Sequence, residues 1–560
     1  MNITEKIRQF FKGDVVDDEP SLNEYSRDAS IFTIKPRVVA FPKDVNDIKN
    51  LVKFVSREKL EKLEISLTPR AAGTDMSGGP LTDSIVVSTT KYLNHVKEVG
   101  DLPAQAGLPA SEEGGYAITE PGVFYRDFDK LTREKGYILP SYPASRELCA
   151  VGGMVGNNSG GEKNLAYGET EKWVESLKMV LADGNEVEFG ELSFEQLEKK
   201  KKGASLEAEI YQKMSKLLTD NYDEVKAARP QVSKNSSGYF LWNVMDREAR
   251  TFDLSRMIVG SQGTLGIITE IKFRLVKPKN HARMLIILLK DLNLLPEVVN
   301  KVMAYKPESF ESYDDNTMKI GLKFFPDILK IMKGNLFTMA FQFLPEFWMV
   351  LTGGIPKLIL MAEFTGDSDE EAYQKTAKAH ESLRGMRLKT KITKTEKEIK
   401  KYWTFRRESF NLLRHHMKGT RTAPFIDDVI VRPEKLPEFL PKLNALLKQY
   451  DLTYTIAGHI GDGNFHIIPL MKLSDPEAKE VIENLSKQVY KLVVEYGGSI
   501  TAEHNDGLVR SPFVRAMFGP KVFSLFEQTE KIFDPQNIFN PVKKINATLE
   551  YSMEHLDTKI

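Results

Sequence analysis

Three glycine-rich segments in the first half of the chain restrict its possible folds more than any other feature. They are PRAAGTDMSGG (69–79), GGMVGNNSGGEKNLAYG (152–168) and VGSQGTLGIITE (259–270). Small residues let main-chain N–H groups approach a phosphate without side-chain interference, so each segment is a candidate ligand contact. Because the chain has neither a G-x-G-x-x-G nor a G-x-x-x-x-G-K-[ST] motif, the nicotinamide Rossmann and P-loop architectures are disfavoured.

Short runs rich in valine and isoleucine alternate with helical patterns along both halves of the chain. The first half predicts strands at 37–42, 63–69, 84–89 and 267–276, with a helix at 45–60. The second half predicts strands at 285–289, 358–364, 424–431 and 453–458, with helices that include 368–384 and 475–496. We therefore expect an N-terminal arm with a short helix (1–35), a mixed α and β domain (36–277), a second domain of split βαβ units (278–545) and a tail (546–560).

Composition argues against several classes of protein. The 78 Lys and Arg residues balance 78 Asp and Glu residues, and this formal net charge of +0 disfavours a nucleic-acid binder. The single cysteine, Cys149, allows no internal disulfide and no iron–sulfur cluster held by this chain's own thiolates. Low cysteine usage and a first segment without a continuous apolar core indicate a cytoplasmic protein without a signal peptide.

One stretch, from 335 to 362, is unusually apolar. Pro345, Gly353, Gly354 and Pro356 interrupt it, so it offers no uninterrupted run long enough to span a bilayer. Residues 358–364 are expected to form a buried strand, which leaves an apolar insert at 321–352. Two interpretations remain open for this insert: a helical segment packed on the second domain, or an interfacial patch that contacts a membrane or a partner.

Two further segments carry a candidate metal site and a candidate base. They are GHIGDGNFH (458–466) and SITAEHNDG (499–507), which together offer His459, His466, Glu503 and His504. Two neutral imidazoles and one carboxylate form a usual set of ligands for an open divalent-metal site. A further histidine, whose reference pKa lies near neutrality, is a candidate acid or base. Gly461 and Gly463 predict a turn that brings His459 and His466 to one side.

The order of these motifs resembles a known group of flavoproteins. PRAAGT, PASRELCAVGGMVGNNSGG, GSQGTLGIITE, GHIGDGNFH, AEHNDG and FDPQNIFNPVK follow one another as in the vanillyl-alcohol oxidase / p-cresol methylhydroxylase (PCMH) superfamily. The resemblance runs from about Asp28 to Ile545 and is strongest to its FAD-dependent D-2-hydroxyacid dehydrogenases. It implies an α+β protein in which a two-subdomain PCMH-type FAD-binding domain precedes a ferredoxin-like FAD-linked oxidase C-terminal cap domain.

The resemblance implies particular flavin contacts. The pyrophosphate loop would comprise Pro69, Arg70, Ala71, Ala72, Gly73, Thr74, Ser77 and Gly78. The adenosine and ribityl side would be lined by Pro143, Ser145, Gly152, Gly153, Gly156, Asn157 and Asn158. A third contact would come from Gly263, Thr264 and Ile268. No histidine lies between His95 and His281, so we expect noncovalent FAD, with Cys149 interpreted as a core thiol.

The resemblance also assigns chemical roles. His459, His466 and Glu503 would hold a divalent metal, zinc or manganese, which would lower the pKa of the substrate hydroxyl. His504 would take the hydroxyl proton while hydride passes to flavin N5. In WTFRRESF (403–410), Arg406 would bind the substrate carboxylate, with Arg407 as its competitor. Asn464 would hydrogen-bond the substrate or a ligand, and Asp427 and Asp428 would support the site or be simply structural. D-lactate is the first candidate substrate.

Two departures from the family pattern leave alternatives open. The family commonly has G-E-H-G where this chain has Ala502-Glu503-His504-Asn505, and asparagine tolerates left-handed backbone geometry. Long relatives often continue into an iron–sulfur domain, so electrons would pass here to a quinone, an iron–sulfur or cytochrome subunit, an electron-transfer flavoprotein or oxygen. The alternatives are a related flavoenzyme acting on a sugar acid or an alkylglycerone-phosphate-like substrate, and a redox-complex subunit. A further alternative is that the protein contacts the inner face of the membrane peripherally, through the apolar insert at 321–352.

Overall fold

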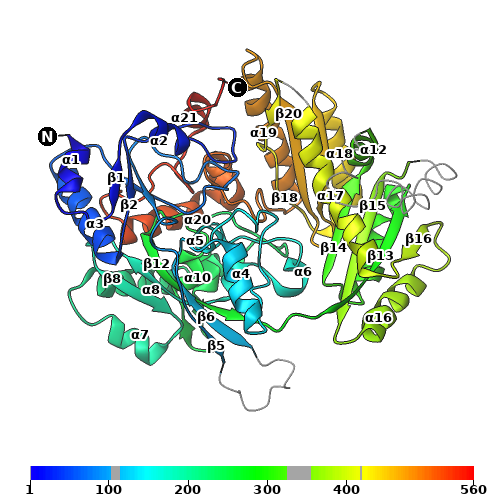
Figure 1. Ribbon diagram of the computed structural model, residues 1–560, viewed down its shortest axis with the longest axis horizontal. Helices are drawn as coiled ribbons and strands as arrows, with labels where there is room; N and C mark the ends of the chain where they lie inside the picture. Colours follow the sequence, from blue (N-terminus) through cyan, green and yellow to red (C-terminus); the bar gives the residue numbers. More distant parts are fainter. Residues whose placement is uncertain (1, 103–113, 324–354, 417–418, 560) are drawn as a thin grey trace.

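Two sheet-containing domains form the molecule, as the computed structural model in Figure 1 shows. The structure describes residues 2–102, 114–323, 355–416 and 419–559. The first domain lies on the left of Figure 1 and the second on the right, and the chain passes from one to the other after β12 (Ile267–Leu275). The apolar insert predicted at 321–352 lies outside the described residues from 324 onward.

A small sheet with the order β1-β2-β4-β3 opens the first domain. Its members are β1 (Asp14–Val16), β2 (Val38–Phe41), β3 (Leu67–Arg70) and β4 (Ile85–Ser88), with β2, β3 and β4 parallel. The predicted helix at 45–60 is α3 (Val45–Leu60), capped by the Asp44 side chain. The N-terminal segment contributes more than a helix, because β1 pairs antiparallel with β2 and extends this sheet.

A second sheet of the first domain has the order β5-β6-β12-β7-β8 and is antiparallel throughout. Its other members are β5 (Val96–Asp101), β6 (Gly115–Thr119), β7 (Val174–Val180) and β8 (Glu186–Gly190). Along β12 the burial alternates residue by residue, as a strand with one buried face requires. The first and second glycine-rich segments begin at the end of β3 and on α5 (Val151–Asn157).

The second domain contains an eight-stranded sheet whose first half has the split βαβ arrangement that the sequence predicted. Strands β13 (His281–Leu289), β14 (Ser309–Asp314), β15 (Leu358–Gly366) and β16 (Lys389–Ile392) lie in the order β16-β13-β15-β14. The crossover helices are α11 (Leu295–Met303) and α16 (Asp369–Ser382). This is the ferredoxin-like order, in which neighbouring strands are antiparallel.

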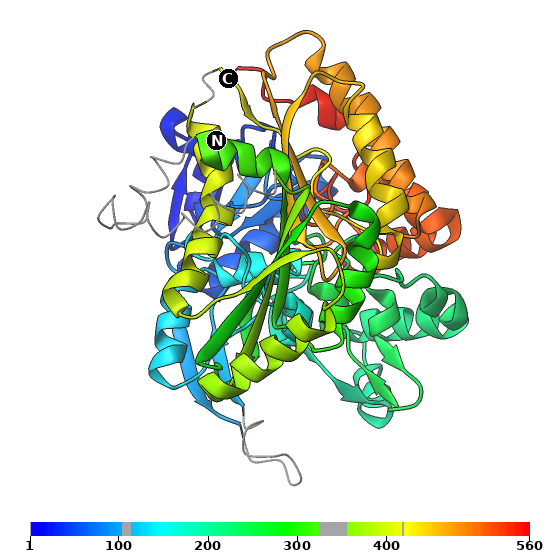
Figure 2. The ribbon, with the colours of Figure 1, turned by 90° about the vertical axis from the view of Figure 1, so that its right-hand side faces the viewer.

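Alternate residues of β13 pack on opposite faces of this sheet. Met284 and Ile286 belong to a cluster with Trp403 of α17 (Glu396–His416), whereas Leu285 and Ile287 join the main core on the other face. That core includes residues of α18 (Leu436–Leu447) and α19 (Ala478–Glu495). Figure 2 shows the sheet flanked by α17 on one side and by α18 and α19 on the other. Both faces of β13 are therefore covered, which explains why its consecutive residues are apolar.

Three further strands complete the sheet beyond β14. They are β19 (Thr453–His459), β20 (Asn464–Met471) and β17 (Arg421–Thr422), while β18 (Val429–Ile430) pairs with β20 off this path. The strand predicted at 424–431 is wrong apart from this two-residue β18. The left-handed backbone of Asp428 (φ 64°) breaks the extended run, because a strand requires negative φ.

After the sheet, the chain returns to the first domain. Helix α20 (Ser511–Phe533), kinked at Gly519, packs against α8 (Leu206–Asp220), and Phe539 bridges to Leu67. In Figure 1 α20 lies within the first domain, above α8. Helix α21 (Leu549–Glu554) follows, and Leu556 bridges to Phe32. The last fifty residues thus pack on the first domain.

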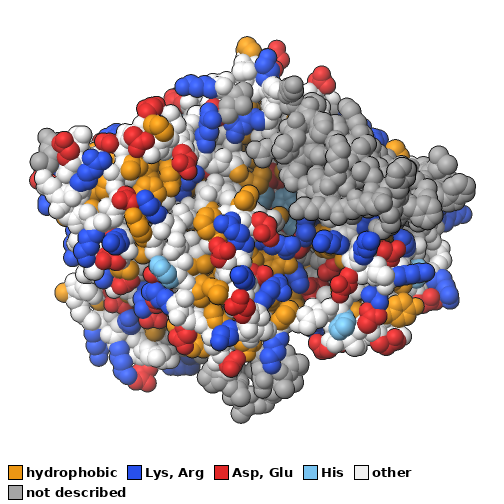
Figure 3. Space-filling model, viewed as in Figure 1, with side chains coloured by type: hydrophobic (Ala, Val, Ile, Leu, Met, Phe, Trp, Pro, Cys, Tyr) orange, Lys and Arg blue, Asp and Glu red, His pale blue; other side chains and the backbone are white. Residues whose placement is uncertain are grey.

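The described surface is ionically mixed. Figure 3 shows acidic and basic side chains interspersed over one face of the molecule, in keeping with the formal net charge of +0. Among the described residues, no helix has the length and apolar character needed to cross a bilayer.

Candidate active site between the domains

A β-hairpin places the two predicted histidine ligands on one side. β19 ends at His459, the turn at 460–463 follows, and His466 lies on β20, opposite Ala457. Gly463 has φ 76°, and a Cβ there would lie 1.9 Å from the Val431 carbonyl oxygen, so glycine is required. The rings of His459 and His466 consequently lie with centroids 5.3 Å apart.

The second motif is a tight turn around the carboxylate of Asp428. One oxygen, Oδ2, accepts hydrogen bonds from the Thr501 hydroxyl (2.7 Å) and from the main-chain N–H groups of residues 502, 503 and 504 (2.9, 2.7 and 2.7 Å). A fully buried carboxylate is stabilised by such convergent donors. Asp428 therefore fixes the backbone from which Glu503 and His504 project.

His459, His466 and Glu503 come together as a potential ligand set. One atom from each lies within 4.8 Å of the others, and Nε2 of His459 is 3.4 Å from Oε1 of Glu503. Tetrahedral ligands at about 2.1 Å from a zinc ion are separated by about 3.4 Å, which is the spacing of the His459 and Glu503 atoms, and all three donors are of types that bind such an ion.

Two buried carboxylates orient the histidines from behind. Nδ1 of His459 is hydrogen-bonded to Oε1 of Glu311 at 2.5 Å, and Nδ1 of His466 to Oδ1 of Asp427 at 3.2 Å. A carboxylate that accepts from Nδ1 leaves Nε2 free to act as a ligand. Burial lowers the pKa of His459, but the charge of Glu311 outweighs it and raises the pKa to about 9. Protonation of His459 therefore competes with metal binding.

His504 stands beside this ligand set. Its ring stacks on that of His466 with centroids 5.1 Å apart, and its Nδ1 lies 2.9 Å from Oδ2 of Asp427. Burial lowers the pKa of His504, whereas the charges of Asp428 and Asp427 raise it to about 9. The carboxylates therefore make His504 more basic, so that it must lose its own proton before it can accept one, and Nε2 is the atom left to face a ligand.

Lys234 is a site residue that sequence reasoning missed. Its ammonium lies 2.6 Å from Oε1 of Glu503 and 3.2 Å from Oδ2 of Asp462, and the three side chains are at most 5% exposed. Burial raises the pKa of Glu503, but Lys234 and then His459 lower it further, well below its usual range. The sequence offers one hint of this role, because Lys234 opens the segment KNSSGYFLW (234–242). No spacing along the chain predicts that Lys234 contacts Glu503.

The two arginines of α17 point to different carboxylates. Arg406 forms an ion pair with Oε2 of Glu311, and Arg407 forms one with Oε2 of Glu162. The Nε atom of Arg406 is buried without a hydrogen-bond partner. An orphaned donor of this kind in a cavity wall is available to an anionic ligand.

One cavity joins this cluster to the glycine-rich loops. The predicted residues that line it are Pro69, Arg70, Ala71, Ala72, Gly73, Thr74, Pro143, Ser145, Gly152, Gly153, Gly156, Asn157, Gly263, Ile268, Arg406, His459, His466, Glu503 and His504. Five predicted residues do not line it: Ser77, Gly78, Asn158, Thr264 and Asn464. Asn464 is instead buried, and its amide donates to Oδ1 of Asp428 and to the Val429 carbonyl.

The cavity has the features of a flavin site. A Cβ on Gly156 would meet no atom within 4 Å, and one on Gly153 would meet only the Ala71 Cβ, at 3.4 Å. Glycine at these lining positions therefore leaves room for a flat ligand between the walls. Cys149 also lines the cavity, and burial raises the pKa of its thiol to about 12. Asp75, Met76, Glu162, Gln262 and Gly266 line it as well, and all five lie within the three glycine-rich segments.

Comparison with known families agrees with this geometry. Residues 36–190 match the family described as FAD binding domain, and residues 279–544 match FAD linked oxidases, C-terminal domain. The chain is similar to the D-2-hydroxyglutarate dehydrogenase of Pseudomonas putida, with 25% identity over 95% of this chain and 50% of the relative. It therefore spans about half the length of that relative and of similar long ones.

Two shorter relatives are matched over nearly their whole length. They are the D-lactate dehydrogenase of Archaeoglobus fulgidus (26% identical, 95% of this chain and 97% of the relative) and the glycolate oxidase subunit GlcD of Bacillus subtilis (24%, 93% and 91%).

Two solved structures share the fold. p-Cresol methylhydroxylase gives a TM-score of 0.66 at 14% identity over 97% of this chain and 96% of the other. Alkyldihydroxyacetonephosphate synthase gives 0.64 at 13% over 96% and 84%. The predicted two-domain α+β fold is confirmed.

Proposed function

Because the chain belongs to the vanillyl-alcohol oxidase / p-cresol methylhydroxylase flavoprotein superfamily, with an FAD binding domain and an FAD-linked oxidase C-terminal domain, we propose that it oxidises a D-2-hydroxyacid to the 2-oxoacid. One observation carries the proposal. A base, a ligand set for a divalent ion and an arginine donor line the same cavity as the glycine-rich loops. A substrate there would contact all three together with the flavin.

Each residue of the site has a definite task in this reaction. Bound FAD would accept the two electrons, and an ion held by His459, His466 and Glu503 would make the hydroxyl more acidic. Arg406 binds the substrate carboxylate through its unpartnered Nε. Nε2 of His504 removes the hydroxyl proton, and Asp427 stabilises the resulting imidazolium. The substrate loses this proton and the C2 hydride, and the product is the 2-oxoacid.

D-lactate is the substrate that we propose first within this class. Arg406 is paired with Glu311 but keeps an unpartnered donor at Nε, whereas Arg407 is paired with Glu162, which also accepts from Nη1 of Arg146 at 3.1 Å. A substrate with one carboxylate requires Arg406 alone, while a second carboxylate would have to displace Glu162 from Arg407. The names of the relatives include both D-lactate and D-2-hydroxyglutarate dehydrogenases, so both acids belong in the test.

We propose that the electrons leave through a redox partner rather than through a metal cluster of this chain. The candidates are a quinone, an iron–sulfur or cytochrome subunit, and an electron-transfer flavoprotein. The 560 residues contain one cysteine, Cys149, and a single thiol cannot ligate an iron–sulfur cluster by itself.

Anaerobic bleaching of the flavin absorbance tests the function directly. The FAD-loaded protein is mixed with D- or L-lactate, glycolate or D-2-hydroxyglutarate, with His504→Ala as the test variant and the exposed His95→Ala as the matched control. We expect one D-acid to bleach the flavin and His504→Ala to slow bleaching about 10²- to 10⁴-fold, while His95→Ala resembles wild type. A yellow protein that none of these acids bleaches would disprove the proposal and favour a sugar-acid or ether-lipid substrate.

A further inference from the structure

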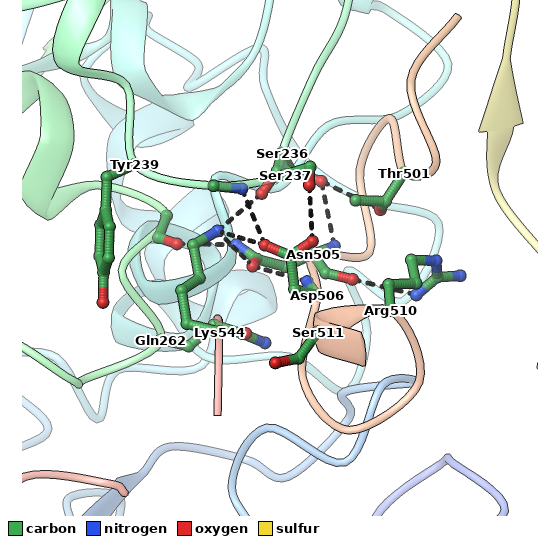
Figure 4. Close-up of polar contacts among 12 residues, drawn as sticks. Ser236, Ser237, Tyr239, Gln262, Thr501, Asn505, Asp506, Arg510, Ser511 and Lys544 are labelled. Atoms are coloured by element: carbon green, nitrogen blue, oxygen red, sulfur yellow. Dashed lines mark hydrogen bonds and ion pairs between the residues drawn. The ribbon is translucent and has the colours of Figure 1, made fainter. Parts of the chain in front are cut away.

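Asn505 lies at the junction between the candidate catalytic turn and the flavin-side loops. It directly follows Glu503 and His504, it is fully buried, and Figure 4 shows it surrounded by residues from distant parts of the chain. Its backbone has φ 64°, a conformation for which glycine is the usual residue. Asparagine reproduces this turn and adds an amide side chain.

The Asn505 amide group links the turn to two loops of the first domain. Nδ2 donates to the Gly260 carbonyl at 2.8 Å and to the Asn157 carbonyl at 3.1 Å. Asn157 lines the cavity, and Gly260 is the second residue of the third glycine-rich segment, whose Gln262 and Gly263 also line it. The same side chain thus contacts both walls next to which a flavin would lie.

The other polar atoms of Asn505 are held equally firmly. Oδ1 accepts from Nζ of Lys544 at 2.7 Å, the main-chain N–H donates to Ser236 Oγ at 3.0 Å, and the carbonyl accepts from Arg510 Nη1 at 3.0 Å. Lys544 is itself paired with Asp506 at 3.0 Å, both being completely buried. Every hydrogen-bonding group of Asn505 is therefore used, and its rotamer is fixed.

We infer that Asn505 is a positioning residue that sets His504 in register with the flavin. This inference rests on the proposed function. The backbone of the adjacent His504 cannot shift relative to the cavity wall without stretching the Asn505 contacts to residues 157 and 260. Misplacement of a base by about 1 Å costs on the order of 10²-fold in rate, so the link matters to chemistry more than to substrate affinity.

Two substitutions separate the side chain from the backbone turn. Asn505→Gly keeps the left-handed turn and removes the amide. Asn505→Asp keeps the size and the acceptor for Lys544, but replaces the donor to the two carbonyls with an oxygen that repels them. The matched control is Asn537→Gly, because Asn537 is also left-handed (φ 53°) but is exposed and lies outside the cavity lining.

The experiment measures flavin bleaching and FAD affinity with the full chain. For both Asn505 variants we expect the limiting rate of bleaching to fall about 10- to 100-fold, with the substrate concentration at half-maximal rate changed less than about threefold. We also expect the FAD dissociation constant to rise about tenfold, which corresponds to about 1.4 kcal/mol, because the two flavin-side loops lose their shared donor. Asn537→Gly should match wild type in both quantities.

Bleaching rates and FAD affinities that match those of wild type in Asn505→Gly would overturn the inference. If Asn505→Gly does not fold, Asn505→Asp decides by the same two measurements. If no acid bleaches the wild type, the proposed function fails, but the FAD dissociation constants still test Asn505: unchanged values in its variants overturn the link, and raised values support it.

Discussion

The ammonium of Lys234 lies 2.6 Å from the carboxylate of Glu503, although 269 positions separate the two residues. Lys234 belongs to the first domain and Glu503 to the turn that carries the candidate base. The contact is buried and includes Asp462 of the histidine hairpin. One cation therefore neutralises acidic groups from both motifs of the proposed metal site.

Lys234→Met should destabilise the protein without a bound metal ion. Removing one partner of a buried ion pair costs about 3–5 kcal/mol, because the charges of Glu503 and Asp462 stay buried and uncompensated. Added Zn²⁺ should restore part of this loss by binding Glu503, so the rise in Tm on adding the ion should exceed that of wild type. Thermal unfolding with and without Zn²⁺ measures both effects. Lys216→Met, at an exposed ion pair with Asp220, is the control, and an equal loss in the two variants would contradict the prediction.

Metal affinity should rise with pH. The pKa of His459 is about 9 instead of 6.5, so below pH 9 a metal ion must displace a proton from this imidazole. The affinity for Zn²⁺ or Mn²⁺ should increase about tenfold per pH unit between pH 7 and 9 and then level off, as competition with a chelator would measure. Glu311→Gln removes the carboxylate that raises the pKa of His459, so in this variant the metal affinity should level off at a lower pH. An affinity independent of pH over this range would exclude His459 as a ligand.

Asp428→Ala should disrupt the turn that bears Glu503 and His504. Four donors lose their shared acceptor, and each unsatisfied buried group costs about 1–3 kcal/mol. We expect a loss of several kcal/mol in the free energy of unfolding, together with weaker metal binding. Asp428→Asn retains one acceptor oxygen and tolerates the left-handed backbone, so its loss should be smaller. Chemical denaturation measures both variants, and equal losses would argue against the role of the carboxylate.

Arg406→Met should weaken substrate binding more than Arg407→Met. The charged hydrogen bond from Arg406 to the substrate carboxylate is worth about 1.5–3 kcal/mol, which corresponds to about a 10- to 150-fold higher KM. Arg407 is already paired with Glu162, so its replacement should change the KM for D-lactate much less. Steady-state kinetics with an artificial electron acceptor compares the two variants. The reverse ranking would assign the carboxylate to Arg407.

A buried carboxyl away from the site predicts a pH dependence of stability. Burial raises the pKa of Asp314 to about 6, against the opposing hydrogen bonds from Thr317. Between the ordinary value of 3.8 and about 6, the folded protein keeps a proton that the unfolded chain has lost, so this contribution to stability falls as pH rises. Its slope is at most about 1.4 kcal/mol per pH unit. Asp314→Asn should remove this contribution, and denaturation of both proteins across this range should show their difference changing with pH.

The local sequence determined those elements whose conformation depends on residues nearby in the chain. The helix α3 begins and ends as its apolar period and Asp44 cap dictate. The spacing of His459 and His466 around Gly463 places both rings on one side of a hairpin. In each case the deciding contacts lie within a few residues, so the pattern is readable along the chain.

Long-range contacts decided the rest of the site. Glu311 behind His459, Lys234 beside Glu503 and the Asp428 carboxylate under the 502–504 turn come from separate segments, and no local spacing predicts such pairings. The predicted strand at 424–431 failed for the same reason, because the donors at 501–504 hold Asp428 in a left-handed conformation that its apolar neighbours do not require. The sequence thus determined which groups can do chemistry, and the tertiary structure decided how burial and neighbouring charges orient and tune them.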